Sequence, residues 1–430
     1  MPPGRLAGPQ PEIIIINTCT VSSKADQKSR RLIRKLLRDQ GQSCVIVTGC
    51  YAQLDTNDIE QLADEHRHSP FPRLLVMGKG SCAAASKCPL LRLPSFLAQA
   101  IAEQPHKSLA EILANWMDSA SEDSPFNFKP QEFTFHSRAY LKIQDGCDNS
   151  CSFCRVRLAR GPSISLDAGE ALAQLLVLES QGCAEAMVTG VNITQYRHGS
   201  LDLAGLLAFL LAGSSSIALR LASLEPEGID EKLAAVLADP RIRPHFHLSV
   251  QSGSPSILQA MGRAYDLPAL IKAVMLLKSA KEHPFLACDI IAGFPGETEH
   301  DFAQSLAFCE THAFAWIHAF PYSRRPGTAA LALGNHVSEG QVKQRVKALT
   351  KLALQNRRRY AESWLGRELT AVIVRSSKQQ LEAVADNYLK LVIKHTGTAP
   401  LPGSAIRCVL VELCEGGDGE KPDAIAEIKE

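Results

Sequence analysis

Apolar and polar residues are arranged in three different patterns along the chain, and each pattern predicts a different region. From about residue 11 to 95, apolar runs at 13–16, 45–47 and 74–77 are separated by polar stretches, one of which is basic and helical, Lys24 to Arg38. Continuous apolar runs are typical of parallel strands that are covered on both faces. The order strand, helix, strand therefore predicts a small α/β domain with a parallel sheet.

The second pattern repeats a strand and then a helix from about residue 132 to 360. Leucine- and alanine-rich stretches of helical periodicity, such as Glu170–Glu179 and Asp202–Leu211, separate the apolar runs. Six such units predict a partial (β/α)6 barrel, whose ligands gather at the carboxyl ends of its strands. The expected strands are Ala139–Gln144, Ala186–Thr189, Ala218–Leu221, His247–Val250, Ala287–Ile291 and Trp316–Ala319.

The third pattern, from about residue 361 to 430, consists of short strands broken by Gly, Pro, Asn and Asp. This texture favours a small β-barrel. Four strands are expected, at 369–374, 382–384, 388–394 and 406–412, and the last fifteen or so residues are expected to be acidic and frayed. The chain, of the α/β class, is thus expected to consist of an N-terminal domain at 1–95, a connector at 96–131, the partial barrel at 132–360 and the β-barrel domain at 361–430.

Length and composition indicate a cytoplasmic protein without a membrane span. A chain of 430 residues holds two or three domains with ample core. Its 13 cysteines are an odd number, and no secretory signal is seen at its start, which argues against a disulfide scaffold. No uninterrupted apolar run reaches membrane-spanning length. Because the net charge is only +1, a nucleic-acid partner would have to be met by local basic patches.

Three cysteines, Cys147, Cys151 and Cys154, carry the strongest chemical signal. Three thiolates at this spacing can hold three irons of a cubane [4Fe–4S] cluster and leave the fourth iron open for a ligand. A zinc knuckle is the alternative, but it needs four ligands, often two Cys-x2-Cys pairs, and no second pair or nearby histidine follows. Cys19 and Cys50 each follow an expected strand, at the edge where open α/β sheets bind ligands.

Several sequence motifs resemble those of the radical S-adenosylmethionine (SAM) methylthiotransferases. Cys-x3-Cys-x2-Cys with an aromatic residue before the last cysteine is similar to the superfamily signature. The match covers nearly the whole chain in the family's order of motifs, and the third region, 361–430, which contains Ala385-Asp-Asn-Tyr-Leu389, is similar to a TRAM domain, a nucleic-acid-binding fold. The motifs are Asn17-Thr-Cys-Thr-Val21, Gly49-Cys-Tyr-Ala-Gln53, Leu141 to Cys154, Arg160-Gly-Pro-Ser163, Ser223-Leu-Glu-Pro226, His247 to Gly253, Asp289 to Thr298 and Phe320 to Thr328.

This resemblance implies an enzyme in which the open iron chelates SAM, and electron transfer then splits SAM to give a 5′-deoxyadenosyl radical. It also implies residues of the SAM pocket, each of which has a structural alternative. Phe153 would pack beside the adenine or simply within its loop, and Glu297 would contact SAM or begin a helix. The remaining candidates stand after expected strands, where turn chemistry is the alternative, and are Gly190, Asn192, Gln251 and Gly293.

Two motifs, Gln144 to Asn149 and Gly49 to Gln53, most resemble the MtaB branch of the family. That branch implies methylthiolation of C2 of N6-threonylcarbamoyladenosine at position 37, beside the tRNA anticodon. Sister branches act on isopentenyladenosine at the same position or on an aspartate of a ribosomal protein. The implied partners are the tRNA anticodon stem-loop, an external electron donor and a sulfur source, and a monomer is expected.

The first region departs from the family in its cysteines. Family members use three there to bind an auxiliary [4Fe–4S] cluster, and Cys19 and Cys50 match the second and third of them. The first, in a Gly-Cys-x-x-Asn stretch, has no counterpart, so the chain is expected to begin late and the auxiliary site to lack one ligand. Conceivable substitutes are Cys44, Cys82 and Cys88. A truncated, non-catalytic tRNA-binding protein therefore remains an alternative.

Two expected helices are rich in basic residues, which contact phosphates or simply form solvated faces. The first carries Lys24, Lys28, Arg31, Arg34, Lys35 and Arg38, and the second carries Arg345, Lys347, Lys351, Arg357, Arg358 and Arg359. The third region has slightly more acidic than basic residues, so it would hold RNA less by charge than by stacking, for which Tyr388 is a candidate.

Overall fold

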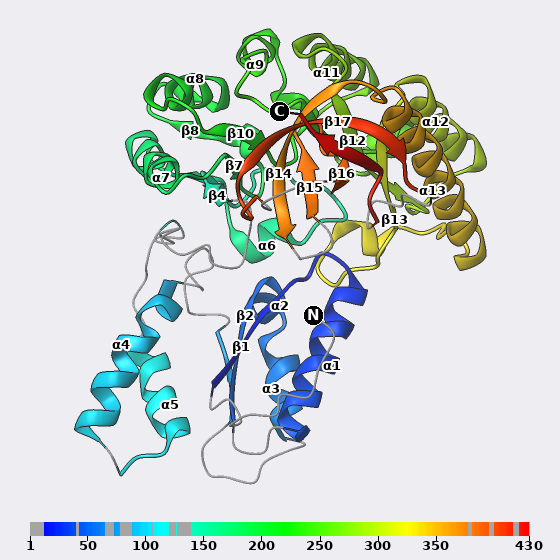
Figure 1. Cartoon of the computed structure of the whole chain (residues 1–430). Coiled ribbons are helices and arrows are strands. Elements are labelled where there is room, and N and C mark those ends of the chain that lie inside the picture. The colour runs from blue at the N-terminus through cyan, green and yellow to red at the C-terminus, as the bar shows by residue number, and fades with distance from the viewer. Residues whose placement is uncertain are drawn as a thin grey trace.

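A computed structural model describes the chain at 13–39, 43–64, 73–77, 88–104, 106–119, 126, 139–376, 381–394, 400–415 and 421–429. Three bodies follow one another along it: an N-terminal α/β domain, a central domain of alternating strands and helices, and a C-terminal β-barrel (Figure 1).

The N-terminal domain is a parallel sheet of order β1-β2-β3 with helices on both faces. Strand β2 explains the continuous apolar run, because Val45 and Val47 face the cluster formed with α1 and α3, while Ile46 faces the cluster formed with α4 and α5. The elements are β1 Ile13–Thr18, α1 Ser23–Asp39, β2 Cys44–Gly49, α2 Cys50–Leu54, α3 Thr56–Asp64, β3 Leu74–Val76, α4 Cys88–Glu103 and α5 Leu109–Ser119.

The expected parallel sheet is thus confirmed, and the structure adds an unexpected layer. Helices α4 and α5 occupy much of the stretch expected to be a connector, and Leu93, Leu113 and Trp116 from them are buried against the sheet. The expected boundaries at 95 and 131 stay predictions. Cys82 lies outside the described residues, as does the side chain of Cys88.

The central domain contains the six expected parallel strands, in two sheets of order β10-β7-β4 and β11-β12-β13. A parallel bridge between Leu224 and Leu248 links the two sheets into one curved wall, and helices cover its outer face (Figure 1). The strands are β4 Ala139–Lys142, β7 Glu185–Thr189, β10 Ala218–Leu221, β11 His245–Gln251, β12 Phe285–Ala292 and β13 Trp316–Pro321. The helices are α7 Ala168–Ser180, α8 Leu203–Gly213, α9 Glu231–Leu237, α10 Pro255–Ala260, α11 Leu267–Ala280, α12 Glu299–Thr311 and α13 Glu339–Glu362.

Local sequence determines where the outer helices begin. Helices α7, α8, α9 and α11 each start after an aspartate whose side chain accepts the N–H three residues later, namely Asp167, Asp202, Asp230 and Asp266. Short elements lie between the strands and helices: β5 Gln144–Asp145, α6 Val156–Arg160, β6 Ile164–Ser165, η1 Ile193–Gln195, β8 Arg197–His198, β9 Leu201–Asp202, η2 Pro226–Gly228 and η3 Ala329–Ala332.

The C-terminal body is a closed barrel of order β14-β15-β16-β18-β17. The expected β-barrel is confirmed, but the expectation of frayed last residues is wrong, because β18 pairs with both β16 and β17. The inward residues of β18, Ala424 and Ala426, are small, so they gave little hydrophobic signal in the sequence although both are fully buried. The strands are β14 Glu368–Ser376, β15 Leu381–Ala385, β16 Lys390–Lys394, β17 Ala405–Leu413 and β18 Ala424–Ile428. Among the described helices, none combines the length and the apolar character that crossing a bilayer requires.

Candidate functional site

The three clustered cysteines lie in the loop between β5 and α6, at the carboxyl end of the first barrel strand. The loop is closed on itself, because the Cys147 N–H donates to the Gly161 carbonyl at 3.1 Å. Gly146 makes this closure feasible: its φ is +72°, and a Cβ there would stand 1.9 Å from the Pro162 carbonyl oxygen. A glycine is therefore required just before Cys147.

Gln144 ties this loop to the loop after β7. Its side chain is fully buried, its amide N–H groups donate to the carbonyls of Asp145 and Gly146 at 2.9 and 2.8 Å, and its amide oxygen accepts from the N–H of Asn192 at 2.8 Å. A glycine is also required at the predicted site residue Gly190, since a Cβ there would lie 2.8 Å from the Gln144 amide oxygen. The structure thus brings two of the predicted site residues, Gly190 and Asn192, next to the cysteine loop.

Each of the three sulfurs has a hydrogen-bond donor. The Asn192 side-chain amide lies 3.8 Å from Cys147 Sγ, a guanidinium N–H of Arg263 donates to Cys151 Sγ at 3.0 Å, and the Val156 N–H donates to Cys154 Sγ at 3.3 Å. Burial raises the pKa of all three thiols, that of Cys154 to about 11. Without a metal the thiols are therefore protonated, and iron ligation would displace their protons.

Arg263 contacts the cysteine loop, which the sequence did not reveal. Its guanidinium is almost completely buried, also donates to the Glu225 carboxylate, and lies over the Tyr265 ring at 4.8 Å. Burial raises the pKa of the Glu225 carboxyl to about 7, although Arg263 opposes this shift. Arg263 stands 112 positions after Cys151, and no local pattern marks this pairing.

The donor set fits a cubane cluster better than a single ion. Among the described residues, no group of three or more His, Cys, Asp or Glu side chains converges closely enough to hold one metal ion. In a cubane each thiolate binds a different iron, so the sulfurs need not meet at one point. N–H donors aimed at the sulfurs are also what Fe–S clusters use in their surroundings.

The two cysteines of the N-terminal domain meet at one sheet edge. Thr18 and Gly49 are register partners at the ends of β1 and β2, and Cys19 and Cys50 each follow them by one residue. Gly49 has φ +99°, and a Cβ there would stand 2.2 Å from the Thr18 carbonyl oxygen. Cys44, by contrast, opens β2 and is buried in the core, six residues or about 20 Å of extended strand from Cys50. It does not reach this edge.

This sheet edge faces the cysteine loop of the central domain. Arg160, at the end of α6, donates to Cys50 Sγ at 3.1 Å and to the Asp145 carboxylate at 3.1 Å. Arg155, at the start of α6, forms a two-pronged pair with Asp55 at 2.9 and 3.0 Å. Helix α6, which follows the cysteine loop, therefore contacts the N-terminal domain at both of its ends.

A second buried pair attaches helix α1 to the central domain. Arg325 bonds the Asp26 carboxylate at 2.7 Å and donates to the Thr20 carbonyl at 2.9 Å. Beside it, the Ser23 N–H donates to the Ser323 hydroxyl at 3.0 Å. The polypeptide around Cys19 is thus held against the strand ends of the barrel.

Two further SAM candidates stand at strand ends as expected. Gln251 closes β11 with φ +62°, a left-handed conformation that is uncommon for a residue with a side chain. Phe153 is half-buried and packs on the apolar cluster that contains Met261 and Phe294. Their contact with SAM stays a prediction.

Gly293 and Glu297 are brought together with α13. The Gly293 N–H donates to the Glu297 carboxylate at 2.6 Å, and Arg345 of α13 binds the same carboxylate at 2.6 Å. Burial raises the pKa of Glu297. A role of either residue in binding SAM also stays a prediction, but the contacts in the structure tie this carboxylate to the fold.

A polar cluster inside the barrel was not foreseen either. His247 of β11 lies 3.0 Å from the Asp289 carboxylate of β12 and 3.1 Å from the Ser223 hydroxyl. His318 of β13 stands beside it, with ring centroids 5.0 Å apart. The alternation of inward residues along β11, β12 and β13 was the signal that could have found it.

Three of the residues considered for RNA contact are engaged inside the protein instead. Arg345 and Arg357 are buried, and Arg357 pairs with Asp423 of the C-terminal barrel at 2.5 and 2.7 Å. Tyr388 stacks on His245 with ring centroids 4.0 Å apart. The interpretation of these three as phosphate or base contacts was wrong, because long-range partners take up their charges and the ring.

Comparison with known proteins agrees with this geometry. Residues 141–309 match the radical SAM superfamily, and residues 7–68 match uncharacterized protein family UPF0004. The chain is 40% identical to threonylcarbamoyladenosine tRNA methylthiotransferase MtaB of Treponema pallidum, over 92% of this chain and 89% of the relative. It is 31% identical to tRNA-2-methylthio-N(6)-dimethylallyladenosine synthase of Jannaschia sp., over 83% and 74%. Among solved structures, a radical SAM methyltransferase from Kitasatospora setae matches with a TM-score of 0.49 and 14% identity, over 75% of this chain and 66% of that one.

Proposed function

Because the chain belongs to the radical-SAM tRNA methylthiotransferase family, we propose that it adds a methylthio group to C2 of N6-threonylcarbamoyladenosine at position 37 of tRNA. The choice of substrate follows the relative at 40% identity, which covers most of both chains. The cofactors of this chain are [4Fe–4S] and SAM, as in the superfamily whose model the central domain matches.

One observation supports the proposal: α6, which follows the loop of Cys147, Cys151 and Cys154, contacts Cys50 of the N-terminal domain through Arg160. Cys147, Cys151 and Cys154 would hold the SAM-binding cluster, and Cys19 and Cys50 would contribute to the auxiliary cluster. Arg160 bridges the two sites by contacting Cys50 and Asp145. A reaction that needs a radical and a sulfur atom at one carbon requires such proximity.

The chain's own residues orient and shield the reactants. When bound, the SAM-ligated cluster supplies one-electron cleavage of the sulfonium, which gives a 5′-deoxyadenosyl radical. The buried Arg263 donates to Cys151, and Gln144 accepts from the loop after β7. Gln251, Gly293 and Phe153 are the residues proposed to border SAM. The polar cluster of His247 and Asp289 inside the barrel offers hydrogen-bond partners to a substrate group that enters the barrel.

The partners follow from the reaction. The anticodon stem-loop of tRNA is the macromolecular substrate, and an external electron donor and a sulfur source complete the reaction. The enzyme acts in the cytoplasm as a monomer.

Mass spectrometry of tRNA nucleosides tests the substrate. A strain that lacks the methylthio derivative of threonylcarbamoyladenosine should regain it when this chain is expressed. Preference for this base would rest on polar groups that pair with the threonyl carboxylate and carbamoyl amide, which an isoprenoid leaves unpaired and buried. Exposed Arg324 is a candidate partner of that carboxylate, whereas Arg160 already binds Asp145 and Cys50.

A second candidate substrate is isopentenyladenosine of tRNA, the dimethylallyladenosine in the name of the relative from Jannaschia. Appearance of methylthio-isopentenyladenosine instead would move the chain to that branch. Methylthiolation of a ribosomal-protein aspartate would move it to the third branch, and tRNA binding without SAM cleavage would leave only a non-catalytic binding protein.

A further inference from the structure

Helix α1 carries the densest positive charge among the described elements of the N-terminal domain. From Ser23 to Asp39 it has seven Lys and Arg against two Asp, whereas the whole chain has a net charge of +1. The side chains along one face line a surface hollow of about 570 Å³ and are Gln27, Arg30, Arg31, Arg34, Lys35 and Arg38. These six residues are called the α1 stripe below.

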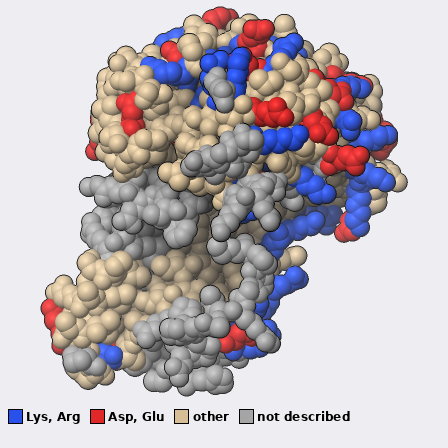
Figure 2. Space-filling view, in the orientation of Figure 1, with Lys and Arg blue, Asp and Glu red and all other residues tan. Residues whose placement is uncertain are grey.

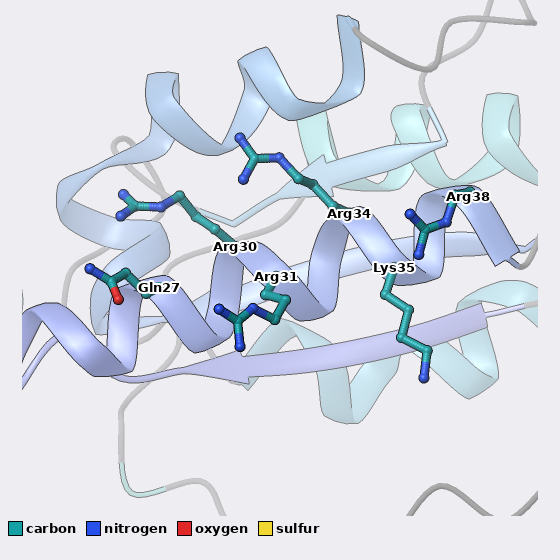
Figure 3. A pocket seen from close by; sticks show the side chains of 6 residues that line it. All are labelled: Gln27, Arg30, Arg31, Arg34, Lys35 and Arg38. Atoms are coloured by element: carbon teal, nitrogen blue, oxygen red, sulfur yellow. The ribbon is translucent and has the colours of Figure 1, made fainter.

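The α1 stripe forms two rows that run along the helix. Figure 3 shows Arg30 and Arg34 along one side and Arg31 and Lys35 along the other. The spacing of three and four residues keeps the rows on one face, and the stripe is about 17 Å long at 1.5 Å per residue. A stripe of this length can contact several phosphates of a nucleic-acid stem.

Two cations of the stripe are available to a ligand. Arg31 and Lys35 are exposed, and the structure shows no hydrogen bond or ion pair for either with the described part of the chain. Arg30 and Arg38 have weaker ties, to the Tyr51 hydroxyl at 2.9 Å and to neighbouring Asp39 at 3.0 Å. An exposed cation that is not paired with an acidic side chain loses little when it binds a phosphate.

The stripe is held in a fixed place relative to the reaction site. Asp26 and Ser23, in the first turn of α1, bind Arg325 and Ser323 of the central domain. Lys35 lies twelve residues after Ser23, about 18 Å along the helix axis. In the space-filling view, Lys and Arg side chains follow the right-hand flank down onto the N-terminal domain, the side where α1 lies (Figure 1, Figure 2).

On these grounds, and resting on the proposed function, we infer that the α1 stripe binds the phosphate backbone of the anticodon stem while the base enters the site. The C-terminal barrel, which resembles a nucleic-acid-binding domain, offers less positive charge for contact with the stem beside the reaction site. Residues 361–430 carry eleven Asp and Glu against eight Lys and Arg, and the barrel packs on the first residues of β11 and β12, away from the cysteines.

The chemistry of the stripe favours RNA over an acidic protein, such as an electron carrier. A protein interface is centred on aromatic or apolar anchors, but among the residues that the structure describes, the lining of this hollow consists of one glutamine and five cations. Four of those cations are arginines, whose planar forks match phosphate oxygens. Contacts of this kind position an RNA without reading its sequence.

The test compares binding of anticodon stem-loop RNA by the parent chain and by Arg31→Gln/Lys35→Gln. We expect about tenfold weaker binding, about 1.4 kcal/mol, and a salt dependence of log K that is shallower by roughly 1.5 to 2. Cleavage of SAM without RNA should be unchanged. A short oligonucleotide that fills the reaction site but does not extend to the stripe should bind both proteins equally, which a general folding defect would not produce.

Two variants serve as matched controls. Lys232→Gln/Lys272→Gln removes the same charge from α9 and α11 and should leave RNA binding unchanged. Arg31→Lys/Lys35→Arg keeps the charge and should restore the parent salt slope. Equal loss in the Lys232 and Lys272 control would reduce the effect to net charge and overturn the inference.

Two further outcomes separate this inference from the proposed function. If the stripe variant binds RNA normally while the parent chain makes the methylthio product, the inference fails and the function stands. If the variant loses RNA binding while no methylthio-threonylcarbamoyladenosine is made by the parent chain, the function fails and the inference stands. Normal RNA binding together with lost reduction by an acidic flavoprotein would assign the stripe to a protein partner and overturn the inference.

Discussion

The two small domains contact the central barrel at opposite ends of its strands. The C-terminal barrel does so through a shared apolar cluster together with the buried pair of Arg357 and Asp423, and the N-terminal domain through polar pairs. The C-terminal barrel shares one buried apolar cluster with the first residues of the strands, in which Phe285 and Ala287 pack with Leu389 and Leu391. The N-terminal domain has its own buried clusters, which among the described residues include none from the central barrel. It is attached by polar pairs, chiefly Arg155 with Asp55 and Arg325 with Asp26.

This difference separates stability from reactivity. A shared apolar core gains from burial and cannot open without exposing that surface to water. A polar junction gains less net free energy, because its charges must be desolvated, but it fixes geometry. The structure uses the apolar junction away from the cysteines and the polar junction beside them, where Arg160 contacts Cys50.

The largest expected effect sharpens the first half of this comparison. Arg357→Leu leaves the Asp423 carboxylate buried without its guanidinium, so we expect a loss of about 3–5 kcal/mol in the free energy of unfolding. Denaturant titration measures it. Arg358→Leu, at the next position of α13, breaks an exposed pair with Glu362 and should cost less than about 1 kcal/mol. Equal losses would show that the barrel junction is not the stabilising one.

The next effect probes the polar junction. Asp55→Asn removes the charge that holds Arg155, so the N-terminal cysteines lose their fixed position relative to the cysteine loop. We expect methylthio product to fall on the order of 10- to 100-fold, while SAM cleavage without RNA changes less than about twofold. Product analysis and 5′-deoxyadenosine quantification in one reaction measure both. A proportional fall of both activities would contradict a purely positional role.

The smallest effect concerns a cysteine that the structure assigns to the core. Cys44 is buried between the sheet and helices α4 and α5, so Cys44→Ala should cost about 1 kcal/mol of stability. Iron content and methylthio product should equal those of the parent chain. Loss of iron from this variant would show that Cys44 ligates a cluster and would break the assignment of Cys19 and Cys50 to a separate edge.

Sequence patterns predicted the framework well, because apolar runs mark strands that are buried on both faces. All six barrel strands lie where such runs occur, and the cysteine loop follows the first of them. Strand β18 escaped prediction, because Ala424 and Ala426 carry too little apolar surface to stand out. Helices α4 and α5 were expected as a connector, because Ser, Asp and Pro interrupt the pattern around them.

The site was predictable only where its residues are close in sequence. Three cysteines within eight positions identified the loop, but the partners of their sulfurs come from distant segments, Arg263 among them. Long-range pairing also reassigned Arg357 and Tyr388 from RNA contact to the domain junction. A single sequence shows that such side chains are charged or aromatic, while the fold decides what they face.

In the proposed function the two cysteine sites have separate tasks, and one measurement tests this most directly. 5′-Deoxyadenosine and methylthio-nucleoside are quantified in the same anaerobic reaction for Cys151→Ala and Cys19→Ala. We predict that Cys151→Ala reduces both products to background, because it removes an iron ligand, whereas Cys19→Ala keeps SAM cleavage and loses only the methylthio product. SAM cleavage near the parent rate in Cys151→Ala, or loss of both products in Cys19→Ala, would contradict the account.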